Sequence, residues 1–323
     1  MNSSFLKRII KKFLFILDLI LAPLVLISAV VLKLIRRAGV QRMIVSRSIF
    51  HKVGVFPIID HYYEPLFNFK SMKYRKEDRN LNGINFNVSE QLNLLNSFNY
   101  NNELLEIPLK KNKEFEYYYY NGYFGPGDAE FYYSIIRHYK PKNIIEVGSG
   151  FSTLMALKAK RKNQESNDVC NIVCIEPFEN PWLEKLDVIY KRNLIENIEL
   201  NFFTILDKND ILFVDSSHVI KPGGDVLYIF LHVLPQLKPG VIIHIHDIFT
   251  PKDYPEEWIV KEKRLWNEQY LLEAFLSFNN KFKVIGALNF LKHNFPHEIS
   301  GKCPILANDL ARCEPGSFWM MKV

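Results

Sequence analysis

The chain has 323 residues, of which 48% are hydrophobic and 14% aromatic, and its 41 Lys and Arg against 35 Asp and Glu give a formal net charge of +6. This composition suffices for a sizeable core, and the small charge, with no basic stripe interleaved with aromatic residues, argues against a nucleic-acid-binding protein. Four cysteines in a chain of this length do not make a disulfide framework and indicate reduced thiols in the cytoplasm.

The first predicted element is an apolar segment near the N-terminus. Residues 13–32 read FLFILDLILAPLVLISAVVL, and about 20 such residues can cross a bilayer as a helix. Asp18 and Pro23 inside it leave open whether the helix spans the membrane, bends or lies in the interface. Basic residues flank both sides, at Lys7, Arg8, Lys11, Lys12, Lys33, Arg36, Arg37 and Arg42.

We therefore expect residues 1–52 to form a membrane anchor and a basic juxtamembrane helix. Membrane lipid is then the partner of residues 13–32, and the remainder of the chain lies on the cytoplasmic side. A buried helix of a soluble protein and a cleaved signal peptide are the alternatives, and they fit the length of the apolar run less well.

Residues 53–124 are predicted to form a loop and a helical cap. Proline and glycine bracket the polar segment DHYYE at 60–64, which predicts an extended loop that either contacts substrate or packs on the domain. Residues 80–113 are rich in Asn and Lys with scattered leucines and indicate peripheral helices. The aromatic run at 117–120 either stacks on a bound ring or packs in the core.

Residues 125–323 alternate between apolar strands and helices. This order predicts a mostly parallel sheet covered by helices on both faces, with an antiparallel edge pair at the C-terminus. The expected strands are 143–147, 171–176, 187–191, 211–215, 241–246, 282–285 and 318–323. The expected helices are 128–139 with Asp128 as its cap, 153–162, 182–186, 226–237 and 266–278, with a short amphipathic piece at 198–206.

The most specific pattern is the segment 143–153, NIIEVGSGFST. A buried strand turns at Gly148-Ser149-Gly150 into a helix N-terminus, the construction of a nucleotide-like cofactor site. Dinucleotide-binding loops read G-x-G-x-x-G, whereas the third glycine position here is Thr153, and Glu146 suits a ligand that carries an ammonium group. Both details resemble motif I of class I S-adenosylmethionine-dependent methyltransferases.

The next strand ends in Glu176, about two dozen residues after the loop, where one carboxylate can accept hydrogen bonds from two ribose hydroxyls. The resemblance places the adenine edge near Asn197, with Glu196 beside it. The cofactor contacts predicted for S-adenosyl-L-methionine are therefore Glu146, Gly148, Ser149, Gly150, Ser152, Glu176, Asn197 and Asp215.

Two further strands end in polar residues on the same side of the sheet. The first ends in DSSH at 215–218, and the second ends in His246 and Asp247. The combination resembles metal-assisted O-methyltransferases such as catechol O-methyltransferase, whose carboxylates hold a magnesium ion that acidifies the substrate hydroxyl. It implies a divalent metal, Mg or Mn, bound by Asp215, His246 and Asp247.

The competing interpretation gives the catalytic role to His218. Oriented by Asp215 or Asp247, this histidine could take the substrate proton directly as a general base. His244 is expected to point away from His246 and to lie in the core.

These segments together resemble a bacterial methyltransferase-24-type family. The resemblance runs from about Gly125 to the C-terminus and is carried by DILFVDSSH at 210–218, HDIF at 246–249, YP at 254–255 and WNEQYLLEAF at 266–275; the anchor and HYYEP at 61–65 are similar to membrane-linked members. It implies a class I, Rossmann-like fold. It also suggests that residues 266–269 line the acceptor pocket, although these four can equally be ordinary capping and packing residues.

The function we expect is a membrane-associated S-adenosylmethionine-dependent O-methyltransferase. The anchor and the aromatic cap favour a sugar hydroxyl of a glycan or lipid-linked precursor as acceptor, with a small molecule or a lipid as the nearest competitor. A membrane-tethered, non-catalytic Rossmann-like scaffold is the alternative from another class. A nicotinamide-dependent oxidoreductase ranks third because the third glycine is missing.

Overall fold

The computed structural model describes residues 3–66, 77–178 and 180–323, and the chain divides into two compact units, Met1–Lys73 and Tyr74–Val323. The predicted cap region, residues 53–124, is divided between the two units: residues 53–66 belong to the first, and residues 77–124 belong to the unit that contains the sheet.

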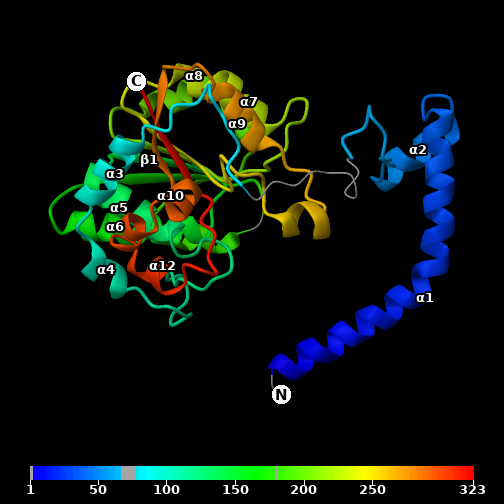
Figure 1. The fold of residues 1–323 in the computed structure, drawn as a ribbon, viewed down its shortest axis with the longest axis horizontal. Coiled ribbons are helices and arrows are strands. Elements are labelled where there is room, and N and C mark those ends of the chain that lie inside the picture. The colour runs from blue at the N-terminus through cyan, green and yellow to red at the C-terminus, as the bar shows by residue number, and fades with distance from the viewer. Residues whose placement is uncertain (1–2, 67–76, 179) are drawn as a thin grey trace. The chain divides into compact units, whose positions relative to one another are not determined.

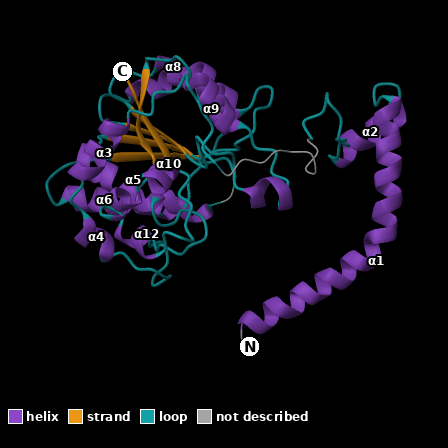
Figure 2. Ribbon diagram, in the orientation of Figure 1, coloured by secondary structure: helices purple, strands orange, loops and turns teal. Residues whose placement is uncertain are grey.

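The first unit consists of two helices and a loop. Helix α1 (Ser3–Ala38) contains Pro23 and bends near its middle in Figure 2, as expected where a proline removes a backbone hydrogen bond. Within its part Arg8–Ala38, an 18-residue window has a mean hydropathy of 2.7 and no buried residues, so by length and composition the helix could cross a membrane. Helix α2 (Ile44–Val53) confirms the predicted basic helix and ends at Gly54, whose φ of 77° favours glycine.

The second unit is built on a seven-stranded sheet in the order β3-β2-β1-β4-β5-β7-β6. The first five strands pair in parallel, and β7 runs antiparallel to both β5 and β6, as predicted. The strands are β1 (Asn143–Val147), β2 (Asn171–Ile175), β3 (Ile189–Lys191), β4 (Ile211–Val214), β5 (Ile242–Ile245), β6 (Phe282–Ala287) and β7 (Phe318–Lys322).

Helices cover both faces of this sheet (Figure 1). Helices α5 (Asp128–Tyr139) and α6 (Phe151–Gln164) pack on one face. The other face carries α9 (Glu268–Leu276) and a continuous helical run made of α7 (Asp225–Tyr228), the π-helical turn η4 (Ile229–Val233) and α8 (Leu234–Gln236).

Shorter helices complete the unit. The predicted peripheral helices are α3 (Val88–Ser97) and α4 (Asn101–Leu105). The pieces expected at 182–186 and 198–206 are 3₁₀ turns, η1 (Pro181–Lys185) and η3 (Leu200–Ile205). The remaining turns and helices are η2 (Ile195–Asn197), η5 (Glu257–Lys261), α10 (Leu288–Asn294), α11 (Pro296–Ser300) and α12 (Pro304–Asn308).

Helices α10 to α12 lie between the last two strands, where the sequence predicts no long helix and does not predict these short ones. Each has seven residues or fewer, too short to show a helical period. Their apolar residues, such as Leu291 and Leu306, nevertheless lie in the core against α5.

The prediction that Asp128 caps α5 is wrong, although the helix begins there. Gly127 is the N-cap, and its N–H donates to Glu130 Oε2 at 2.9 Å. The carboxylate of Asp128 instead accepts hydrogen bonds from the backbone N–H groups of Gly316 and Ser317, at 3.2 and 2.8 Å. It thereby fixes the chain that enters β7.

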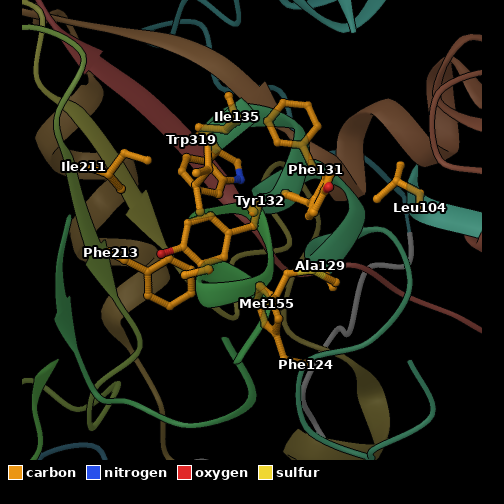
Figure 3. Packing of buried hydrophobic residues seen from close by; sticks show 14 of the residues in the cluster. Leu104, Phe124, Ala129, Phe131, Tyr132, Ile135, Met155, Ile211, Phe213 and Trp319 are labelled. Carbon is orange, nitrogen blue, oxygen red and sulfur yellow. The ribbon is translucent and has the colours of Figure 1, made fainter. Parts of the chain in front are cut away.

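The pairing register of the strands aligns a row of aromatic side chains across the sheet. Phe213 on β4 pairs with His244 on β5, which pairs with Trp319 on β7. Tyr132 of α5 stacks on Phe213 with ring centroids 4.6 Å apart, and Figure 3 shows it beside Trp319 as well. This fully buried row fixes α5 over the centre of the sheet.

The turn from β1 into α6 is held against the end of β4. Gly148 has φ +79°, and a Cβ built there would lie 1.7 Å from the carbonyl oxygen of Asp215. Asp215 also donates its N–H to the carbonyl of Val147 at 2.8 Å, and this hydrogen bond holds the end of β1 against the end of β4. Only glycine satisfies both the backbone angle and the space.

We predict that Gly148→Ala costs at least about 1–2 kcal/mol of the free energy of unfolding, from the left-handed backbone alone, with the overlap at Asp215 adding to it. Denaturant titration measures this cost. Gly150→Ala is the matched control, because φ at Gly150 is −172° and a Cβ there meets nothing within 4 Å. Equal stability of the two variants would contradict the assigned role of Gly148.

Candidate active site

A pocket of about 600 Å³ opens at the carboxyl ends of the strands. Its floor is the glycine turn, and its sides come from the end of β2, the end of β4 and the segment 111–124. Among its lining residues are six of the predicted cofactor contacts: Gly148, Ser149, Gly150, Ser152, Glu176 and Asp215.

Glu176 is held between the turn and its own strand end. Its Oε2 accepts the N–H of Ser149 at 3.2 Å, and its Oε1 accepts the N–H of Phe178 at 2.9 Å. A carboxylate oxygen has two lone pairs, so each oxygen retains acceptor capacity toward a ligand hydroxyl. The carboxylate is therefore oriented before any ligand arrives.

Among the pocket residues that the sequence did not predict are Asn180 and Trp182. The Asn180 side chain donates to the carbonyl of Ser149 and accepts from the indole Nε1 of Trp182, both at 2.9 Å. The signal that could have found them is their place directly after the strand that carries Glu176, where α/β sheets bind ligands.

Glu146 lies beneath the pocket and is absent from its lining. It is fully buried and accepts hydrogen bonds from Tyr132 Oη at 3.1 Å and Thr153 Oγ1 at 2.5 Å, while Thr153 accepts the N–H of Gly150 at 3.1 Å. Burial raises the pKa of Glu146 to about 7, despite these donors. Thr153, at the position of the missing glycine, therefore links Glu146 to the turn.

Asn197 is likewise outside the pocket lining. It is exposed in η2, where its side-chain amide donates to Asn193 Oδ1 at 3.4 Å. Its contact with the cofactor stays a prediction, and the geometry favours Asn180 and Trp182 for that wall.

Aromatic residues from the segment 111–124 close the pocket on the side away from the strands. Tyr123 stacks on Phe151 at 5.6 Å, and Phe115 stacks on Trp182 at 6.3 Å. The run at 117–120 divides between the two roles left open for it. Tyr117 and Tyr119 are in the core, and Tyr118 lines the pocket.

A second group of polar residues adjoins the pocket through Asp215. His218 Nε2 lies 3.3 Å from Asp215 Oδ1 and 3.5 Å from Asp247 Oδ2. One potential ligand atom from each of these three residues lies within 4.8 Å of the others, an arrangement that could hold a metal ion.

Glu268 fixes the orientation of the His218 ring. Its Oε2 lies 2.9 Å from His218 Nδ1, and Glu268 is fully buried at the start of α9. The backbone N–H groups of Asn267 and Glu268 donate to the carbonyl of His218 at 3.0 and 3.2 Å. With Nδ1 bound in this way, Nε2 faces the two aspartates.

Charge in this group is balanced by His218. Burial alone lowers the pKa of His218, but the carboxylates of Asp215 and Glu268 raise it to about 10. Burial raises the pKa of Asp247, whereas His246 and His218 outweigh burial at Asp215 and hold the pKa of that carboxyl low. Without a bound cation, His218 is therefore positively charged at neutral pH.

The cluster differs from the predicted metal set in one member, because His218 takes the place expected for His246. The His246 ring is buried beside Phe124, and its Nε2 lies 3.7 Å from Asp247 Oδ1. The prediction that His244 points away from His246 is wrong. Residues two apart on a strand share a face, and the two rings are 5.4 Å apart. His244 is fully buried in the core, as expected.

Two half-buried tryptophans and an arginine form a wall beside the His218 ring. Trp266 packs on the His218 ring at 4.3 Å. Trp258 and Trp266 pack edge to face with ring centroids 5.2 Å apart, and the Arg264 guanidinium lies against both rings, 4.2 and 4.5 Å from their centroids. This wall faces the cluster from the segment that precedes α9, where the sequence analysis placed an acceptor pocket.

A family model described as a methyltransferase domain, Methyltransf_24, matches residues 145–248. The chain is 33% identical, over 182 residues, to a protein of unassigned function from Archaeoglobus fulgidus, a match that covers 51% of this chain and 80% of the relative.

Similar solved structures include an O-methyltransferase from Bacillus cereus in complex with SAH, at 12% identity and a TM-score of 0.36 over 73% of this chain and 91% of that one. They also include the O-methyltransferase TomG from Streptomyces achromogenes in complex with SAM, at 12% identity and a TM-score of 0.35 over 79% and 93%. The family match and the relative together show that the chain belongs to the Methyltransf_24 family of class I S-adenosylmethionine-dependent methyltransferases, with a Rossmann-like fold.

Proposed function

We propose that this protein is an S-adenosylmethionine-dependent O-methyltransferase attached to a membrane through α1, with its second unit on the cytoplasmic side. One observation carries the catalytic part of the proposal. Asp215 lines the cofactor pocket and is also a member of the Asp215/His218/Asp247 cluster. A methyl donor in the pocket and a hydroxyl at the cluster would therefore meet at one residue.

Methyl transfer requires the acceptor oxygen to attack the methyl carbon in line with the sulfonium sulfur. The new O–C bond forms as the S–C bond breaks, which leaves S-adenosylhomocysteine, and the hydroxyl proton must go to a base. A doubly protonated His218 cannot accept that proton. Asp247, whose pKa is raised by burial, is better placed to take it when no cation is bound.

The residues present also fit a divalent cation. Asp215, Asp247 and the Nε2 of His218 would hold it, and the imidazole ligand favours manganese over magnesium. A bound ion would supply the positive charge that acidifies an acceptor hydroxyl. Proton and cation would compete for His218 Nε2, so metal binding should weaken as the pH falls.

The acceptor we propose is a sugar hydroxyl of a glycan or lipid-linked precursor. The Trp258/Arg264/Trp266 wall supports this choice, since aromatic faces can pack on the C–H faces of a sugar ring beside the cluster. The apolar length of α1 supports attachment to the membrane in which a lipid-linked acceptor would reside.

Calorimetric titration of the full chain with S-adenosylmethionine, with and without magnesium or manganese, tests the cofactor assignment. We expect saturable binding that Glu176→Ala weakens by about tenfold or more, because hydrogen bonds to a charged group contribute about 1.5–3 kcal/mol. The matched control is Glu184→Ala, which removes an exposed carboxylate that pairs with Arg192. If the folded protein does not bind S-adenosylmethionine, the cofactor assignment is contradicted and the non-catalytic scaffold becomes the favoured interpretation.

The contacts of His218 predict the pH at which this histidine titrates. We expect His218 to titrate near pH 10 in the cation-free protein, and Glu268→Gln to lower its pKa by about 1 to 3 pH units, because the substitution removes a charge partner. Histidine-selective NMR titration measures both values, with Glu257→Gln, an exposed carboxylate paired with Lys261, as the control.

The raised pKa of His218 also makes the free energy of unfolding depend on pH. Because it lies above the ordinary value of 6.5, the stability that His218 contributes is complete below about pH 6.5 and is lost as the pH rises through about 10. In Glu268→Gln the stability contributed by His218 should be smaller, and its loss should be complete at a lower pH. A His218 that titrates near 6.5 in the unmodified chain would contradict the assigned contacts.

A further inference from the structure

Helix α2 carries an apolar surface outside the segment predicted to enter the membrane. Val45, Ile49 and Val53 recur at every fourth position, so their side chains lie along one stripe of the helix. Their exposed fractions are 74%, 54% and 67%. A row of aliphatic side chains this open to solvent indicates a surface that another apolar phase covers.

The apolar surface continues beyond the helix. Val55, Phe56 and Ile58 are exposed, and Tyr62 and Tyr63 are 91% and 86% exposed. Tyrosines are enriched where a protein crosses from hydrocarbon to water, because the ring is apolar and the hydroxyl is polar.

Basic side chains accompany this surface. Arg47 and His51 lie one turn apart on the side of α2 away from the stripe, and Arg42 and Lys52 flank it. An amphipathic helix with cations on its polar side and aliphatic residues on the other is the type that lies in a lipid interface.

Contacts within the first unit hold this surface at the basic end of α1. Arg36 Nε donates to Glu64 Oε1 at 2.6 Å, and the Arg36 guanidinium lies 5.0 Å from the ring centroid of Phe56. Phe56 in turn packs edge-on against Phe50 of α2 at 6.2 Å. The apolar surface is thus fixed next to Arg36 and Arg37, where the apolar part of α1 has ended.

We propose that α2 and residues 55–63 form a lipid-binding platform that lies on the anionic surface of the membrane that α1 enters. The inference rests on the proposed membrane attachment of α1. Anionic lipid is the occupant to which the observations point, because the surface is continuous with the candidate membrane helix and its cations complement negative headgroups. A protein partner would need neither the continuity nor the basic flank.

Spin labels on the full chain in phosphatidylglycerol vesicles test the platform. The background is Cys313→Ser, because the other three cysteines are buried. Labels at Ile49→Cys and Arg47→Cys compare the two sides of α2. We expect the ratio of accessibility to oxygen over accessibility to a water-soluble nickel chelate to be several-fold higher at residue 49 than at residue 47.

A third label, at Leu24→Cys, separates the two proposals. If residue 24 is in lipid but residue 49 is as open to nickel as residue 47, the platform is overturned and membrane attachment stands. A residue 24 open to nickel would overturn both. A residue 49 closed to both reagents would indicate a protein contact and also overturn the platform. Phosphatidylcholine vesicles should reduce the contrast at residue 49, and an unchanged contrast would contradict the requirement for anionic lipid.

Discussion

The backbone of Gly148 lies against the carbonyl oxygen of Asp215, so close that no side chain fits between them. This contact joins the end of β1 to the end of β4, and two sites meet there as a result. The turn that forms the pocket floor and the acid that begins the His218 cluster become neighbours, although 66 residues of chain separate Gly148 from Asp215. The arrangement of pocket and cluster depends on that approach.

A second constraint is the negative charge of the carboxylates, Asp215 among them, that surround His218. Three carboxylates surround His218, and burial of such a group is unfavourable unless a positive charge remains among them. His218 and Asp247 also hold φ angles of 58° and 56°, a conformation that costs of order 1–3 kcal/mol at residues other than glycine. The hydrogen bonds from the start of α9 to the carbonyl of His218 help to offset this cost. A proton or a cation at Nε2 balances the charge.

Local patterns in the chain were sufficient to predict the sheet, because five apolar strands, a glycine turn and a C-terminal pair each have a short-range signature. The polar ends of those strands identified Glu176, Asp215 and Asp247. Other features depend on tertiary contacts that no local pattern contains. Glu146 points into the interior because Tyr132 and Thr153 donate hydrogen bonds to it. His246 lies on the same face of the sheet as His244. Glu268 contacts His218 although the two are 50 positions apart in the sequence. Helices α10 to α12 were missed because each is too short for a period.

The measurement that most directly tests a site shared through Asp215 is a crystal structure of the full chain with manganese and a non-transferable amine analogue of S-adenosylmethionine. The expected result is an anomalous manganese peak among Asp215, His218 and Asp247, with the analogue in the pocket beside Glu176 and its amine directed toward Asp215. Manganese bound elsewhere, or an analogue whose amine points away from Asp215, would contradict the shared site.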